Sequence, residues 1–186
     1  MRSGDAIHRQ GRRHHGADLM ALEVHVLALP GPLPAFSWRR DAETDILSGA
    51  FANAPHGAGY TGTVEFNDDE GSIAVIDVAG GVLCGLDIVV WPEVTTMAGL
   101  AAPVEARSGQ VVVPSRAAKR GTSALEFDAT LTASADPGER VYHLRIGTRR
   151  PVEPIRVADG FLVEVDAAQR LAGFWLEGVP PLPDLA

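Results

Sequence analysis

Two stretches decide the fold of this chain, Gly71-Ser-Ile-Ala-Val-Ile-Asp77 and Gly160-Phe-Leu-Val-Glu-Val-Asp166. They match without a gap, from a glycine through an apolar run to an aspartate before the next turn. Successive side chains of a strand point to opposite faces, so the alternation at Ile73 and Val75 predicts a half-buried β-strand. Two matching strands so far apart in one chain indicate a β unit that is present twice.

The flanking segments support the duplication. Val82-Leu-Cys-Gly85 matches Leu171-Ala-Gly173 with one residue lost in the turn, and the segment 41–47 falls against 136–142. The loop at 48–62 is the part that is much longer in the first copy. We therefore predict an all-β fold in which two diverged β-meander repeats pack as a pseudo-dimer, in a sandwich-like arrangement.

Changes in composition divide the chain into four parts. Residues 1–20 are expected to be a disordered tail, because they lack apolar periodicity, and residues 21–95 a first repeat. A linker rich in Gly and Pro follows at 96–123, and a second repeat at 124–186. We expect Leu86–Trp91 to be the most central strand, 111–113 to be an edge strand, and 96–101 to form a short helix. Whether the protein starts at Met1 or Met20 is left open.

The composition narrows the range of functions. Hydrophobic residues make up 46% of the chain, which is enough for a packed core, and the formal net charge is −8. Residues 1–20 carry four arginines against two aspartates, a net +2, so residues 21–186 carry −10. An acidic body repels phosphate, so we expect no nucleic-acid partner, and no apolar run is long enough for a membrane span. Cys84 is the single cysteine, which excludes an internal disulfide and favours a bacterial-type reducing cytoplasm.

One known family resembles the repeats. The string Ala135-Asp-Pro-Gly-Glu-Arg-Val-Tyr142 and the run Glu153 to Pro180 look like the small uncharacterised β domains called DUF2283. The resemblance covers 134–179 well and 36–91 more loosely, and this chain departs from the family's pattern at Ala135, Arg140 and Phe174-Trp175. It implies a small β domain without catalytic residues to carry over. Some relatives resemble the antitoxin partners of small toxins.

A glycine-rich loop is the first candidate site. Gly57-Ala-Gly-Tyr-Thr-Gly62 spells a dinucleotide fingerprint, but such a site needs a strand before it and a helix after it. Here a loop precedes and a strand follows, so we predict a flexible hairpin loop. Should the protein bind a small ligand, His56 and Tyr60 in this loop are where we expect it.

No catalytic or metal centre is predicted, and no cofactor. The acidic run 67–71 lacks calcium-loop spacing, and Asp77 and Asp166 each precede a turn, where aspartate caps the backbone. His25 and His143 lie on strands, where a hydrogen-bonded structural role is favoured. The tail histidines His8, His14 and His15 lack a fixed geometry for a metal ion.

Aromatic residues suggest an interface. Phe174 and Trp175 are adjacent in a strand and must face opposite sides, so one of them is either exposed or packs on a second surface such as the linker. The leading hypothesis is a non-catalytic interaction or regulatory module, antitoxin-like or immunity-like, that binds a protein through an acidic and aromatic face. The alternative is a small-ligand-binding protein or weak enzyme that uses the 48–62 loop. The chain would be a monomer with an internal pseudo-dimer, or a homodimer.

Overall fold

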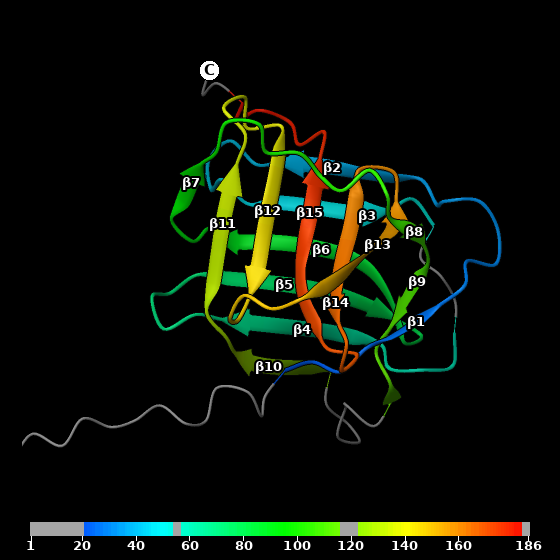
Figure 1. The fold of residues 1–186 in the computed structure, drawn as a ribbon. Coiled ribbons are helices and arrows are strands. Elements are labelled where there is room, and N and C mark those ends of the chain that lie inside the picture. The colour runs from blue at the N-terminus through cyan, green and yellow to red at the C-terminus, as the bar shows by residue number, and fades with distance from the viewer. Residues whose placement is uncertain (1–20, 54–56, 116–122, 184–186) are drawn as a thin grey trace, which may run out of the picture.

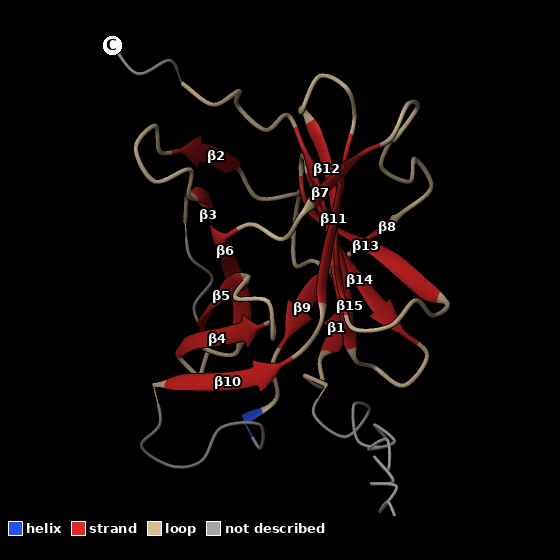
Figure 2. Ribbon diagram, turned by 90° about the vertical axis from the view of Figure 1, so that its left-hand side faces the viewer, coloured by secondary structure: helices blue, strands red, loops and turns tan. Residues whose placement is uncertain are grey.

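The alternating apolar pattern forms strands in two packed sheets. The computed structural model describes residues 21–53, 57–115 and 123–183, and these residues build an all-β sandwich. The strands of one sheet run crosswise to those of the other, and Figure 2 shows the two layers edge-on (Figures 1 and 2). The predicted all-β, sandwich-like class is confirmed.

The first sheet, called sheet one here, contains eight strands of the described chain: β1 (His25–Leu27), β2 (Phe36–Arg40), β3 (Leu47–Phe51), β4 (Gly62–Asn67), β5 (Ile73–Ala79), β6 (Val82–Val90), β9 (Gln110–Val112) and β10 (Ala124–Asp128). Sheet two contains seven: β7 (Val94–Thr96), β8 (Arg107–Ser108), β11 (Leu131–Ala135), β12 (Val141–Ile146), β13 (Val152–Ala158), β14 (Phe161–Asp166) and β15 (Leu171–Glu177).

Five strands follow the same order in both sheets. Sheet one reads β2-β3-β6-β5-β4 and sheet two reads β11-β12-β15-β14-β13, with antiparallel pairing throughout. Counted in chain order within each sheet, the second strand is followed by a strand at the far edge of the five. The fifth strand then pairs with the second. A parallel strand extends that far edge in both sheets, β10 beside β4 and β8 beside β13. A duplicated unit would produce this pattern; common descent of the halves stays a prediction.

The first hairpins of the two sheets share their turn. Asp41 N–H donates to Ile46 O at 2.9 Å, and Asp136 N–H donates to Val141 O at 3.0 Å. Each aspartate also accepts backbone N–H groups within the turn, which lowers the pKa of both carboxyl groups. These are the positions that the sequence alignment paired.

The core lies between the sheets. Residues facing inward from both sheets are almost fully buried, among them Phe66, Ile76, Leu86, Leu144, Phe161 and Phe174. Aromatic rings close one part of this core, where Phe36 stacks on Phe161 at 4.9 Å between centroids. Trp38 joins them and donates its indole N–H to Glu177 O at 3.1 Å, which ties β2 to the end of β15.

The linker departs from its prediction in two ways. Residues 97–100 form a turn rather than a helix, since Leu100 N–H donates to Met97 O. The predicted edge strand is internal, because β9 pairs with both β1 and β6. At the start of the predicted second repeat, residues 125–132 divide between the two sheets: β10 pairs with β4 of sheet one and β11 lies in sheet two.

The start of the predicted 48–62 loop belongs to β3, which pairs with β2 and β6 and places that strand inside sheet one. Strand β6 lies in the interior of this sheet, as expected for the strand ending near Trp91. The described part of the chain has no helix long and apolar enough to cross a membrane.

Candidate functional site

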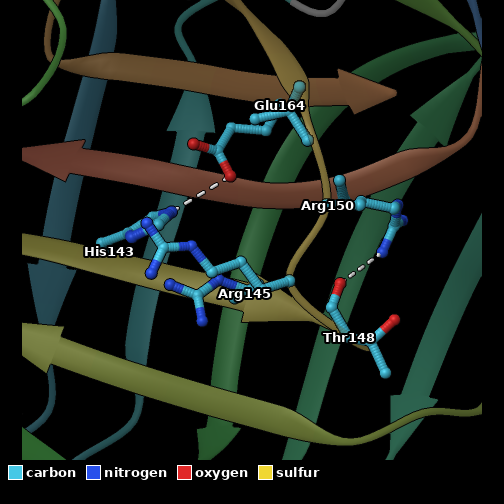
Figure 3. Close-up of a pocket in the computed structure, with 8 residues that line it drawn as sticks. His143, Arg145, Thr148, Arg150 and Glu164 are labelled. Atoms are coloured by element: carbon cyan, nitrogen blue, oxygen red, sulfur yellow. Dashed lines mark hydrogen bonds and ion pairs between the residues drawn. The ribbon is translucent and has the colours of Figure 1, made fainter. Parts of the chain in front are cut away.

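The outer face of sheet two holds a cluster of three side chains. His143 on β12, Glu164 on β14 and Trp175 on β15 come together because their strands are neighbours in the sheet. Trp175 donates its indole N–H to Glu164 Oε1 at 2.8 Å, and His143 Nε2 lies 3.0 Å from Glu164 Oε2 (Figure 3). The imidazole also stacks on the indole, with 4.1 Å between ring centroids and 5° between planes.

Glu164 is a buried carboxylate that is satisfied on both oxygens. Burial by itself raises its pKa, but the hydrogen bonds from His143 and Trp175 and the charge of Arg145 outweigh burial, so the pKa lies below its usual value. The carboxylate is therefore ionised at neutral pH. It holds the imidazole in one orientation with Nε2 as the donor.

A pocket of about 210 Å³ opens beside this cluster. Its lining residues come from β12, β13, β14, β15 and the connection between β12 and β13: His143, Arg145, Thr148, Arg149, Arg150, Val152, Glu164 and Ala172. Figure 3 shows His143 and Arg145 on one side of this space and Thr148 and Arg150 on the other.

The outer face of sheet one is different in character. Cross-strand neighbours in one row are Glu126, Glu65, Val75 and Asp87, on β10, β4, β5 and β6. Asp77 lies on the same face of β5, two residues from Val75. We call the four carboxylates Glu65, Asp77, Asp87 and Glu126 the acidic face. None of the four forms an ion pair within the described chain, and Arg39 on β2 is the one basic side chain of that part in these rows.

Asp77 is a member of the acidic face whose pKa is shifted. Partial burial raises the pKa of its carboxyl group, and the nearby charge of Asp87 raises it further. Cys84 is half-buried beside it, and burial together with the charge of Asp77 raises the pKa of the thiol. A thiol with a raised pKa is a poor nucleophile at neutral pH.

The register places Asp77 and Glu164 in corresponding positions. Asp77 is the cross-strand partner of Gly85, and Glu164 is the cross-strand partner of Gly173. The ungapped sequence match had paired Asp77 with Asp166, which is wrong by two residues. The number of residues between the preceding turn and the residue that pairs with the glycine is larger by two in β5 than in β14. An ungapped match cannot record that difference.

Asp166 is the last residue of β14 and caps the turn that follows, as predicted. Its carboxylate accepts backbone N–H groups of Ala168 and Arg170 and pairs with Arg150 at 2.9 Å. Burial raises its pKa, but these donors outweigh burial and lower it. Asp77 lies inside β5, which continues to Ala79, so the prediction that it directly precedes a turn is wrong. The two aspartates lie in different sheets and have different roles.

Both predicted interface aromatics are buried. Phe174 is 0% exposed in the core, and Trp175 is 9% exposed on the opposite side of β15. Linker residues Leu100, Ala102 and Ala106 pack over Trp175. The predicted alternation is correct, but covering by the linker removes these two residues as surface anchors.

The two residues of the predicted ligand loop, His56 and Tyr60, have different outcomes. His56 lies outside the described residues. Tyr60 is 7% exposed, and its hydroxyl contacts Thr63 O at 2.7 Å and Ser123 O at 3.0 Å, so it joins backbone segments instead of lining a pocket. The glycines have a packing role: a Cβ on Gly59 would lie 2.8 Å from Gly81 Cα. The tail histidines also lie outside the described residues.

The remaining candidates have local roles. Asp68 accepts Glu70 N–H within its turn and Leu131 N–H at 2.6 Å. His25 is exposed beside Glu23. No group of three or more ligating side chains within the described ranges has metal-binding geometry.

Sequence reasoning missed Glu164 and the arginines around it. The signal was a glutamate inside the apolar run Phe161-Leu-Val-Glu-Val165, because a buried charge in a central strand requires partners.

No known family model matches the chain, and no curated protein matches it either.

Proposed function

We propose that this chain is a non-catalytic binding protein that engages a basic protein partner through the acidic face of sheet one. The role would be antitoxin-like or immunity-like, in the cytoplasm, with a cationic toxin or effector as the partner. No catalytic residue is assigned. The observation that carries the proposal is the acidic face itself: four carboxylates lie on neighbouring strands of one sheet face, and none of them forms an ion pair within the described chain.

An arrangement of this kind lowers the stability of the free protein. Glu65 and Glu126 are direct neighbours in the parallel register of β4 and β10, and like charges in that position repel. Lysine or arginine side chains of a partner would relieve this repulsion on binding. Electrostatic complementarity of this kind favours fast association and a choice of partner.

Apolar side chains among the carboxylates supply contact area. Val75 lies between Glu65 and Asp87 in the row, and Ile73 pairs with Val90, which is 43% exposed. An interface usually combines a small apolar centre with a polar rim. The acidic face offers both elements.

The test is affinity capture of a partner from the host lysate at moderate salt. We expect the wild-type chain to retain a basic protein, and to release it as salt rises because the attraction between exposed charges is screened. Retention should fall at least ten-fold in a variant that keeps side-chain size and removes three charges, Glu65→Gln/Asp77→Asn/Asp87→Asn.

A matched control removes three exposed carboxylates outside the acidic face, Glu93→Gln/Glu105→Gln/Asp159→Asn. It has the same net charge as the test variant and should retain the partner at the wild-type level. Equal loss in both variants would mean that net charge alone matters, and would refute a specific face. A wild-type chain that retains no basic protein would refute the proposal.

A further inference from the structure

The pocket on sheet two carries the opposite charge to the acidic face. Three arginines line it, Arg145, Arg149 and Arg150, against the single carboxylate of Glu164. Both oxygens of that carboxylate already accept hydrogen bonds from His143 and Trp175. The pocket therefore has a surplus of positive charge in a chain whose formal net charge is −8.

One of the three arginines is structural. Arg150 donates to Leu171 O at 2.8 Å and to Ile146 O and Thr148 O at 3.1 Å, and it pairs with Asp166. These bonds fix the connection between β12 and β13 around the pocket. The dashed line in Figure 3 marks its bond to Thr148.

The other two arginines remain free to bind a ligand. Arg149 is exposed and forms no ion pair within the described chain. Arg145 is half-buried, and its guanidinium lies near the Glu164 charge without a side-chain hydrogen bond to another described residue. Two guanidinium groups that line one pocket can hold the oxygens of one anion, because the N–H groups of each form a planar fork.

The side chains of this pocket have no chemical counterparts at the corresponding positions of sheet one that the structure describes. The cross-strand register shows that Ala50 corresponds to Arg145 and that Ser48 corresponds to His143. All four residues lie on strands that pair with the glycine-bearing strand of their sheet. Asp87 occupies the place of Trp175. The pocket is thus a property of the second unit and not a by-product of the fold.

We infer that this pocket binds a small molecule through a carboxylate or phosphate group. Arg145 and Arg149 hold its oxygens, and Arg150 shapes the site. His143 is a polar wall whose orientation Glu164 and Trp175 fix. The site lies on a different sheet from the acidic face, so the two proposed binding surfaces share no residue.

The experiment titrates the full chain with inorganic phosphate and, separately, with succinate at constant ionic strength. Proton–nitrogen NMR follows the indole N–H of Trp175, which bonds Glu164 at the pocket wall. We expect a saturable shift of this resonance in the millimolar range or below. The anion that binds more tightly identifies the group that the site prefers.

The test variant is Arg145→Met/Arg149→Met, which keeps the apolar stems. The control is Arg39→Met, which removes one exposed arginine from the other sheet. Binding should weaken at least ten-fold in the first and stay unchanged in the second. Absence of a saturable shift with either anion would overturn the inference, and so would shifts that persist in the double variant. Neither result would bear on the acidic face, which both pocket substitutions leave intact.

Discussion

Asp77 and Glu164 occupy corresponding positions in the two sheets and are in opposite electrostatic states. Each is a carboxylate on an outer face, opposite a glycine of the neighbouring strand. Glu164 accepts two hydrogen bonds and its pKa is lowered, whereas Asp77 faces another carboxylate and its pKa is raised. At this corresponding position, the carboxylate in sheet two has hydrogen-bond donors from the fold, and the carboxylate in sheet one faces a like charge.

The two sheets differ in how far their own residues satisfy the polar groups of the outer face. Sheet two completes its outer face with its own residues, including the linker that covers Trp175. Sheet one leaves four carboxylates without ion pairs inside the described chain. Proteins tolerate local violations of good packing and electrostatics mainly at functional sites, which is why we place the partner surface on sheet one.

The largest effect that would break the comparison comes from removing each carboxylate. Glu164→Ala leaves the buried indole N–H of Trp175 and the imidazole of His143 without their acceptor, so we expect a loss of about 3 kcal/mol in the free energy of unfolding. Asp77→Ala removes a repelled charge and should change that free energy by less than about 0.5 kcal/mol. Urea denaturation of both variants measures the difference. Equal losses would mean that the two carboxylates do not differ as described.

A smaller effect is expected at the two glycines. A Cβ at residue 173 would lie 2.5 Å from Leu144 O, which is backbone and cannot move away, so Gly173→Ala should cost about 2 kcal/mol. At residue 85 the nearest atom is Asp77 Oδ2 at 2.7 Å, at the end of a side chain that can rotate. Gly85→Ala should therefore cost about 1 kcal/mol or less. The reverse order in thermal unfolding would contradict the assigned register.

The smallest effect is a gain in stability. Asp77 has a folded-state pKa above its unfolded value, so its ionisation destabilises the fold at neutral pH and this penalty disappears as pH falls through the raised pKa. Asp77→Asn should raise the unfolding free energy at pH 7 by about 0.5 kcal/mol. The gain over wild type should vanish in acid, as calorimetry at several pH values would reveal. A variant that is less stable than wild type at pH 7 would refute the repulsion.

Much of the fold could be predicted because apolar alternation and turn residues are local properties. The match of Asp41 with Asp136 holds in the structure because both close the same turn. The two-residue error at Asp77 arose because cross-strand register depends on strand length, which an ungapped match does not record. The split of 125–132 between two sheets depends on tertiary pairing with β4 and β12.

The site was harder to predict than the fold. His143, Glu164 and Trp175 are separated along the chain and meet through sheet order alone. Trp175 looked like an interface residue because its linker cover comes from a distant segment. Tyr60 looked like a ligand contact because a tyrosine in a glycine-rich loop gives no local sign of the carbonyls that its hydroxyl meets.

The most direct test of the divergence between the two sheets is an NMR pH titration of side-chain carboxyl carbons in the intact protein. We predict that Asp77 titrates above the ordinary aspartate range and Glu164 below the ordinary glutamate range. Ordinary values for both groups, or shifts of the same sign, would contradict the claim that one carboxylate is satisfied within the fold and the other is left for a partner.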